Sequence, residues 1–383
     1  MKSLVNYYGL QDFTNTPKDI IKKIIKLNIV TNGKYCISLE KKISKLVGSK
    51  YSVVCNNGTS ALMMAILSLK LKNIVAIIPN INFVASASIL SLIKAKFIFC
   101  DVNFKTGMVD TENFKEVLLK CDKQKIKPNL FLPMHYAGNI IDLKKISKIC
   151  KKKSIKIIED GCHSFGSLNY KQNKKSYLGD CKFSEMTTFS FHPVKNITTF
   201  EGGAITLNNK SLYQRILNLR SHSLVKTNIT DPYQLDSPSL NFRMSEISAL
   251  VGIDQIKKIN YFKKKRNLIV KYYLSSFKYI SEKFECLNFY DANIFWHLFV
   301  IKLNSFNNRK KLKFMKYLKK NQIGCQIHYK PLYKHKVYKK NMLFSINKNS
   351  DKFYKSIVTL PLHTLLKKKD LIYISNKVKN FFK

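Results

Sequence analysis

Four short polar segments of the chain contain the residue types that carry covalent and acid–base chemistry. They are residues 56–62, 157–164, 189–204 and 239–250. The third contains Lys195, which follows an apolar run and precedes a Thr-Thr pair and a Glu-Gly-Gly sequence. A lysine is normally a solvated surface charge, but one held inside a site with a lowered pKa can form a Schiff base with a carbonyl group. This context makes Lys195 a candidate catalytic residue.

The second segment supplies acidic groups. Glu159 and Asp160 end an apolar run, where a carboxylate is too costly to leave unpaired. Such groups face a cavity, a cation or a protonated heterocycle, or they form an ion pair within the fold. The sequence leaves these alternatives open.

The first and fourth segments each precede an apolar helical pattern. Gly58 permits a tight turn before Thr59 and Ser60, and free N–H groups at such a helix start bind phosphate. Asn241 and Arg243 precede the other helix. Both patterns also suit ordinary capped helices, so neither identifies a site by itself.

These segments must be positioned by a larger framework, and the first 210 residues alternate strand-like and helical patterns. The expected strands are 51–55, 74–78, 96–102, 130–135, 155–159, 187–191 and 203–207; the expected helices between them are 59–69, 84–94, 111–121 and 142–152. Nearly continuous apolar strands indicate a sheet covered on both faces. The alternation predicts an α/β domain with a mostly parallel, seven-stranded sheet between helices. Ligands of such sheets bind at the carboxyl ends of strands, where the polar segments fall.

The pattern changes near residue 255. A lysine-rich helical stretch at 254–277 is followed by strand-like runs at 295–302 and 323–328 and by a final helix at 369–382. We therefore expect a large domain at 1–255, consisting of an N-terminal arm and the sheet, and a smaller α+β domain at 256–383.

The composition fits a globular protein with an unusual charge. The 383 residues are 45% hydrophobic, which excludes a disordered chain, but 68 basic against 23 acidic residues give a net charge of +45. Such a surplus suggests a nucleic-acid partner. However, only five of the basic residues are arginine, and the lysines are spread along the whole chain. We therefore expect solvated lysine-rich faces and no specific nucleic acid, with nucleic-acid binding as the remote alternative.

Cysteine usage and hydropathy favour a cytoplasmic location. The nine cysteines include no C-x-x-C pair, so no metal site is expected, and reduced thiols suit the cytosol. The N-terminus lacks the apolar core of a signal peptide. Residues 74–93 carry no charge, but their proline, asparagine and serine residues favour a strand, a turn and a helix over a membrane span.

Together, the four segments provide the parts of a pyridoxal phosphate (PLP) site. That cofactor needs a phosphate cradle, a Schiff-base lysine, a carboxylate on the pyridinium nitrogen and a flat side chain over the ring. With these motifs, the sequence resembles the DegT/DnrJ/StrS family of sugar aminotransferases, which are PLP enzymes of fold type I. The motifs are Asn-Gly-Thr-Ser-Ala-Leu, Glu-Asp-x-x-His-Ser, Ser-Phe-x-x-x-Lys and Asn-Phe-Arg-Met-Ser-Glu.

The resemblance implies a role for each matching residue. Lys195 would form the Schiff base with PLP and shuttle the proton, Asp160 would pair with the pyridinium nitrogen, and His163 would contact the ring hydroxyl. Phe83 would stack on the ring. The phosphate would be held by Thr59, Ser60 and Ser190, and by Asn241 of the neighbouring subunit. The active protein would therefore be a homodimer with shared active sites.

The resemblance also implies the reaction. Glutamate would give its amino group to the cofactor, and a keto group of a nucleotide-linked hexose would receive it. Segments 133–138 and 326–333 are most similar to a branch of the family that acts on a UDP-linked 4-keto-6-deoxy-N-acetylhexosamine in pseudaminic acid biosynthesis. Within this last segment, His328, Tyr329 and Lys330 are candidate substrate contacts. A 3-keto sugar or a GDP-linked 4-keto sugar is the alternative substrate, because a few hydrogen bonds decide sugar specificity.

Overall fold

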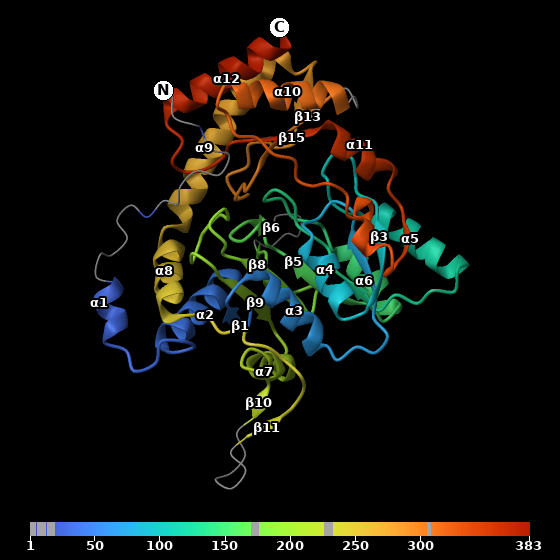
Figure 1. The fold of residues 1–383 in the computed structure, drawn as a ribbon, viewed down its shortest axis with the longest axis vertical. Helices are drawn as coiled ribbons and strands as arrows, with labels where there is room; N and C mark the ends of the chain where they lie inside the picture. The colour runs from blue at the N-terminus through green and yellow to red at the C-terminus, as the bar shows by residue number, and fades with distance from the viewer. Residues whose placement is uncertain (1–4, 6–12, 14–19, 170–175, 226–232, 305–307) are drawn as a thin grey trace.

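The computed structural model describes residues 5, 13, 20–169, 176–225, 233–304 and 308–383. The expected N-terminal arm lies outside the described residues except for Val5 and Phe13. Figure 1 shows a large sheet flanked by helices, with the C-terminal helices and a smaller sheet gathered at one end of the molecule.

The large sheet has eight strands in the order β1, β9, β8, β5, β4, β2, β3, β14. In that order they are Tyr51–Cys55, Gly203–Leu207, Met186–Ser190, Lys156–Asp160, Leu130–Phe131, Val75–Pro79, Lys96–Cys100 and Met342–Ser345. Neighbours from β8 to β14 pair in parallel, whereas β9 is antiparallel to both β1 and β8. All seven expected strands are present. The expected number was one too low, because the C-terminal part adds β14, a four-residue edge strand in a lysine-rich stretch without strand periodicity.

Both faces of this sheet are covered by helices, as its apolar strands predicted. Successive residues of β3 illustrate this, since Phe97 and Ile98 enter different core clusters. One cluster includes α3 (Gly58–Ser68), α4 (Ala85–Leu92) and α7 (Lys210–Leu219). The other includes α5 (Thr111–Lys123) and α6 (Lys144–Lys152). A third lies between the sheet and α2 (Lys34–Val47) and α8 (Glu246–Lys257).

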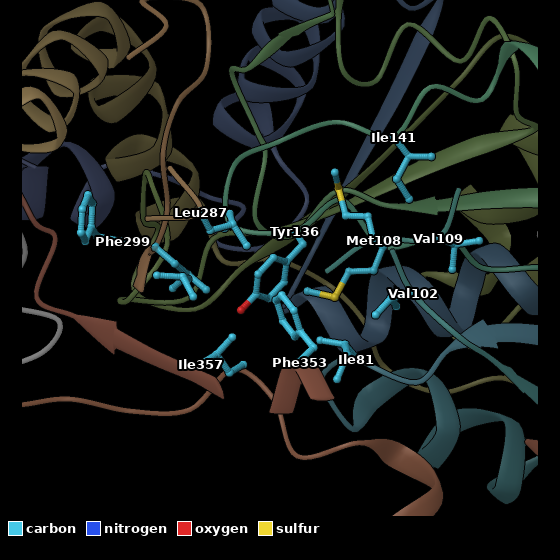
Figure 2. Packing of buried hydrophobic residues seen from close by; sticks show 14 of the residues in the cluster. Ile81, Val102, Met108, Val109, Tyr136, Ile141, Leu287, Phe299, Phe353 and Ile357 are labelled. Carbon is cyan, nitrogen blue, oxygen red and sulfur yellow. The ribbon is translucent and has the colours of Figure 1, made fainter. Parts of the chain in front are cut away.

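The C-terminal part shares a core with the large sheet. It contains α9 (Ile259–Phe277), α10 (Asn308–Lys320), α11 (Lys348–Ser356), α12 (Lys368–Phe382) and a sheet of β12 (Phe284–Cys286), β13 (Phe299–Leu303) and β15 (Ile357–Leu360). Figure 2 shows Tyr136 and Met108 packed with Leu287, Phe353 and Ile357 of this part. The expected strand at 323–328 does not form; Gln326 makes only an isolated bridge to Thr359. The domain division at residue 255 stays a prediction.

The remaining elements are short. They are α1 (Ile20–Ile25), the hairpins β6 (Leu168–Asn169) with β7 (Ser176–Tyr177) and β10 (Leu224–Val225) with β11 (Gln234–Leu235), and the 3-10 turns η1 (Lys278–Ile280), η2 (Leu332–Lys334) and η3 (Lys336–Tyr338). The β10–β11 hairpin projects from the body of the molecule (Figure 1).

Among the described residues, no helix has both the length and the apolar character that a membrane span requires.

Candidate active site

A cavity of about 290 Å³ lies where strands β1, β5 and β8 end. These three strands run in the same direction, so their carboxyl ends meet at one edge of the sheet. The volume is close to the lower end of the range of about 300–1,000 Å³ for small-molecule sites. Its lining residues are Asn57, Gly58, Thr59, Leu62, Phe83, Ala85, Met134, Asp160, Cys162, His163, Ser190, His192, Val194, Lys195, Glu201, Gln326, His328 and Tyr329.

The start of α3 forms one wall of the cavity. The side chain of Asn57 caps this helix, since its Oδ1 accepts a hydrogen bond of 2.8 Å from the main-chain N–H of Ser60. Gly58 lies so close to β8 that a Cβ atom there would be 2.6 Å from Cβ of Ser190. The helix N-terminus and the Ser190 hydroxyl therefore form a tight polar cradle, which suits an anionic group.

The two acidic residues at the end of β5 are both buried but face different groups. Glu159 is buried, and its carboxylate accepts hydrogen bonds from His135 (2.9 Å), Ser184 (2.5 Å) and Thr187 (3.1 Å). Burial alone would raise the pKa of Glu159, but the bond and charge of His135, with the two hydroxyls, hold it below its ordinary value. Asp160 is 7% exposed and lines the cavity. Glu159 is therefore the carboxylate that is hydrogen-bonded within the fold, and Asp160 is the carboxylate of the cavity.

Lys195 extends into the cavity from the loop after β8. Burial lowers the pKa of its amine below the ordinary value, although the nearby Cys162 and Asp160 oppose that shift. A lowered pKa increases the fraction of neutral amine, which is the form that attacks a carbonyl carbon. The chain thus places a nucleophilic amine and a carboxylate in one small cavity.

Three buried imidazoles lie beside this lysine. Burial and the charge of Lys195 lower the pKa of His328 to about 3. Burial also holds the pKa values of His163 and His297 well below the ordinary value, and the centroids of these two rings are 4.4 Å apart. Nε2 of His163 is 2.8 Å from the hydroxyl oxygen of Tyr329, a residue of the C-terminal part. Phe83 is 52% exposed, and the centroid of its ring lies 5.8 Å from that of Tyr329.

The cavity unites most of the candidate residues. Eight line it, namely Thr59, Phe83, Asp160, His163, Ser190, Lys195, His328 and Tyr329. Three others do not: Ser60 is buried in the first turn of α3, Asn241 is exposed, and Lys330 follows Tyr329 outside the lining.

Sequence reasoning did not single out several lining residues. Asn57, Cys162, His192 and Glu201 belong to the polar segments but were not assigned roles, and Gln326 comes from the C-terminal part. His192 and Glu201 approach each other across the loop around Lys195, with 3.6 Å between Nε2 and Oε1. The sequence could have indicated both residues, since they lie in the same segment as Lys195.

Gly161, directly after Asp160, packs closely against β8. A Cβ atom there would be 2.6 Å from Cε1 of Phe189, so the ring of Phe189 occupies the space that a side chain would need.

At its carboxyl edge, the open and mostly parallel sheet carries a lysine of lowered pKa, a buried carboxylate and a helix N-terminus, an arrangement suited to carbonyl chemistry. The sequence matches the DegT/DnrJ/EryC1/StrS aminotransferase family over residues 12–379, and the chain belongs to this family.

Two relatives share similarity over nearly the whole chain. A UDP-4-amino-4,6-dideoxy-N-acetyl-beta-L-altrosamine transaminase of Campylobacter jejuni is 31% identical over 370 residues, which is 96% of this chain and 95% of the relative. A transaminase of the same name from Helicobacter pylori is 29% identical, covering 95% of this chain and 94% of the relative. The branch expected from the sequence is thus the one that these relatives represent.

A solved structure has the same fold. Helicobacter pylori PseC, an aminotransferase involved in the biosynthesis of pseudoaminic acid, matches with a TM-score of 0.88 and 26% identity. The match covers 100% of this chain and 99% of that chain. The predicted architecture of the PLP-dependent aminotransferases is therefore confirmed.

Proposed function

We propose that this protein is a PLP-dependent aminotransferase that moves an amino group from glutamate to the 4-keto group of a UDP-linked 4-keto-6-deoxy-N-acetylhexosamine. Membership of an aminotransferase family supports the reaction, and the names of the relatives support the sugar. The observation that carries the proposal is the position of Lys195, whose amine of lowered pKa lines one cavity with Asp160 and the start of α3.

The residues of the cavity fit the cofactor. Because Gly58 has no side chain, the start of α3 lies directly beside Ser190, where a Cβ atom would collide. This places the helix N-terminus and the Ser190 hydroxyl together, which suits a phosphate bound by main-chain N–H groups. Asp160 supplies a carboxylate with little exposure, suited to a protonated ring nitrogen. Phe83 presents an exposed aromatic ring at the cavity. These groups differ in chemistry, and each matches a different part of PLP.

Each residue has a proposed role. Thr59, Ser60 and Ser190 hold the phosphate, and Phe83 covers the ring. Asn241, which is exposed in the single chain, reaches the phosphate of the partner subunit in a homodimer. His328, Tyr329 and Lys330 contact the sugar nucleotide.

When bound, the cofactor supplies an electron sink that stabilises negative charge on the carbon bearing the amino group. Asp160 keeps the ring nitrogen protonated, which strengthens that sink. Lys195 would hold the cofactor through its amine and, once free, this amine would move a proton between the substrate carbon and the cofactor. The lowered pKa of this lysine would suit both roles.

The proposed setting is the cytoplasm and a pathway for surface glycans such as pseudaminic acid. All nine cysteines are free thiols in the structure, which supports a reducing compartment. The named relatives support the pathway.

The test is to reconstitute the protein with PLP and record its visible absorption. The wild type should acquire a visible band that disappears on borohydride reduction, and Lys195→Ala should lack this band while keeping its far-ultraviolet circular dichroism. Turnover is then measured with glutamate and a panel of UDP-linked 4-keto, 3-keto and GDP-linked 4-keto sugars. A wild type that takes up no PLP would refute the enzyme class. Turnover of only the other sugars would refute the substrate.

A further inference from the structure

A second cavity lies at the edge of the large sheet opposite the active site. Its volume is about 640 Å³, against about 290 Å³ for the active-site cavity, and the two share no lining residue. Strands β5 and β8 run in parallel and begin beside it, at Lys156 and Met186. We call this space the amino-edge cavity, since it lies at the amino ends of two strands whose carboxyl ends lead to Asp160 and Lys195.

The rim of the amino-edge cavity is basic. Three lysines, here called the rim lysines, line it: Lys148 and Lys151 from α6, and Lys182 from the loop before β8. All three are exposed, and none forms an ion pair with another residue that the structure describes. The one acidic residue in the described lining, Glu185, is already neutralised by Lys156, whose Nζ is 3.1 Å from its Oε1. Three like charges around one hollow therefore attract a multiply charged anion.

The floor of the cavity is apolar and fixed. Ile155 and Ile157 of the lining are 4% and 3% exposed. Glu185 and Ile157 exchange two hydrogen bonds, because the N–H of Glu185 donates to the carbonyl oxygen of Ile157 (3.0 Å) and the N–H of Ile157 donates to Oε2 of Glu185 (2.7 Å). The loop before β8 is thus tied to β5, and a floor held in this way needs little ordering when a ligand binds.

An aromatic ring lies next to one of the amines. Phe183 is half-buried and lines the cavity, and Nζ of Lys182 is 5.5 Å from the centroid of its ring. An inorganic anion would use the lysines but leave this ring and the apolar floor in contact with water. A ligand with a flat apolar part beside its anionic part would cover both.

We propose that the amino-edge cavity binds a nucleotide, with its phosphates against the rim lysines and its base against the ring of Phe183. Lysine binds phosphate as a point charge, and a nucleobase stacks on an aromatic side chain. The site is separate from the proposed function, because none of its residues lines the active-site cavity.

The test is isothermal titration calorimetry of the PLP-loaded protein with ADP at about 0.15 M salt, where charges more than about 8 Å apart are largely screened. Reversing two rim charges, Lys148→Glu with Lys182→Glu, should weaken ADP binding about tenfold or more. The matched control is Lys144→Glu with Lys145→Glu, two exposed residues of α6 outside the lining. It changes the net charge equally, so its ADP affinity should stay within about twofold of the wild type if the attraction is local.

Phe183→Leu tests the class of ligand. It keeps an apolar side chain against the core but removes the flat ring, so it should weaken ADP binding by several-fold and leave the binding of inorganic pyrophosphate unchanged. The visible band of bound PLP should be the same in all these variants.

Several outcomes would overturn the inference. They are a wild type that binds no ADP, ADP binding that survives reversal of the rim charges, and equal weakening by the two charge-reversed pairs. Equal affinities of Phe183→Leu and the wild type for ADP would overturn the assignment to a nucleotide. If a charge-reversed pair fails to fold, Lys148→Ala with Lys182→Ala against Lys144→Ala with Lys145→Ala gives the same comparison. A wild type without a visible band would refute the proposed function and not this site.

Discussion

At the scale of single residues, Glu159 and Asp160 have different tasks because successive side chains of a strand face opposite sides. Glu159 faces the hydrogen-bond network of His135, Ser184 and Thr187, and Asp160 faces the cavity. Of these two acidic neighbours, one is hydrogen-bonded within the fold and the other is available to the proposed cofactor.

Exchanging each carboxylate for its amide should separate these tasks. Asp160→Asn should lower kcat by about a hundredfold or more at unchanged stability, because an amide cannot keep the cofactor ring nitrogen protonated. Glu159→Gln should retain PLP binding but lose about 1–3 kcal/mol of unfolding free energy, since it leaves His135 without its charged partner. Activity assays and urea denaturation measure the two effects.

The pH dependence of stability gives a further check on Glu159. Its pKa in the folded protein is lower than the ordinary 4.5, so its stabilising contribution is complete above that value. The contribution is lost as the pH falls through the folded pKa. Glu159→Gln should therefore lose stability at pH 7 and approach the wild type in acid. Equal loss at both pH values would contradict this account of the ion pair.

The sequence could single out Asp160, Lys195 and the start of α3, which line one cavity, since each occurs in a contiguous motif. It could not tell which of the two carboxylates faces the cavity, because the partners of Glu159 come from two other parts of the chain, His135 and residues 184–187. It also could not foresee the bond between His163 and Tyr329, which joins residues 166 positions apart. Contacts of this kind are fixed by tertiary packing.

At the scale of elements, the capped N-terminus of α3 also forms part of the cavity wall. Asn57 satisfies the N–H of Ser60, and the same helix start forms the wall of the cavity beside Ser190. Helix α7 offers a comparison, because Asn209 caps it in the same way, with 3.0 Å to the N–H of Leu212, and does not line the active-site cavity.

Alanine substitutions at the two caps should therefore differ in function. Asn57→Ala and Asn209→Ala should each cost about 1 kcal/mol of unfolding free energy. Only Asn57→Ala should weaken PLP binding, by several-fold in Kd, because it disorders the helix start that we propose holds the phosphate. Thermal denaturation and a fluorescence titration with PLP measure these effects. Equal PLP affinity in both variants would show that α3 does not hold the phosphate.

The elements were predictable where local periodicity was strong. All seven expected strands form, and the final helix expected at 369–382 is α12. The failures depend on distant pairing: β14 is a strand only because β3 offers a free edge, and residues 323–328 make only isolated bridges despite their apolar pattern. Local sequence does not encode the availability of a partner strand.

At the scale of the whole molecule, the arginines and the lysines occupy different positions in the fold. Arg220 forms a largely buried ion pair with Glu40 at 2.7 Å, and Arg266 donates to three main-chain carbonyl oxygens that include that of Leu362. These arginines bind parts of the fold together. Lysines predominate on exposed helix faces, such as that of α10. The charge therefore gives no specific support to nucleic-acid binding.

The proposed homodimer has support from the distribution of apolar side chains. Several are exposed near the N-terminal helices and the β10–β11 hairpin, among them Ile25, Ile29, Val30, Ile37, Leu224, Leu235 and Leu240. Leu240 is 55% exposed and precedes Asn241, the residue proposed to enter the partner's site. A second copy of the chain would remove this apolar surface from water and complete both sites.

Mixing two inactive variants tests whether sites are shared between subunits. Lys195→Ala breaks the site of its own subunit, and Asn241→Asp puts a negative charge beside the phosphate of the partner subunit. In a mixed dimer, the intact lysine of one subunit faces the intact asparagine of the other, which restores one of two sites. Random pairing should thus recover about a quarter of wild-type activity. Lys195→Ala mixed with Asp160→Asn should recover none, since both residues belong to the same chain's cavity. The same absence of recovery with Asn241→Asp would place each site within one chain.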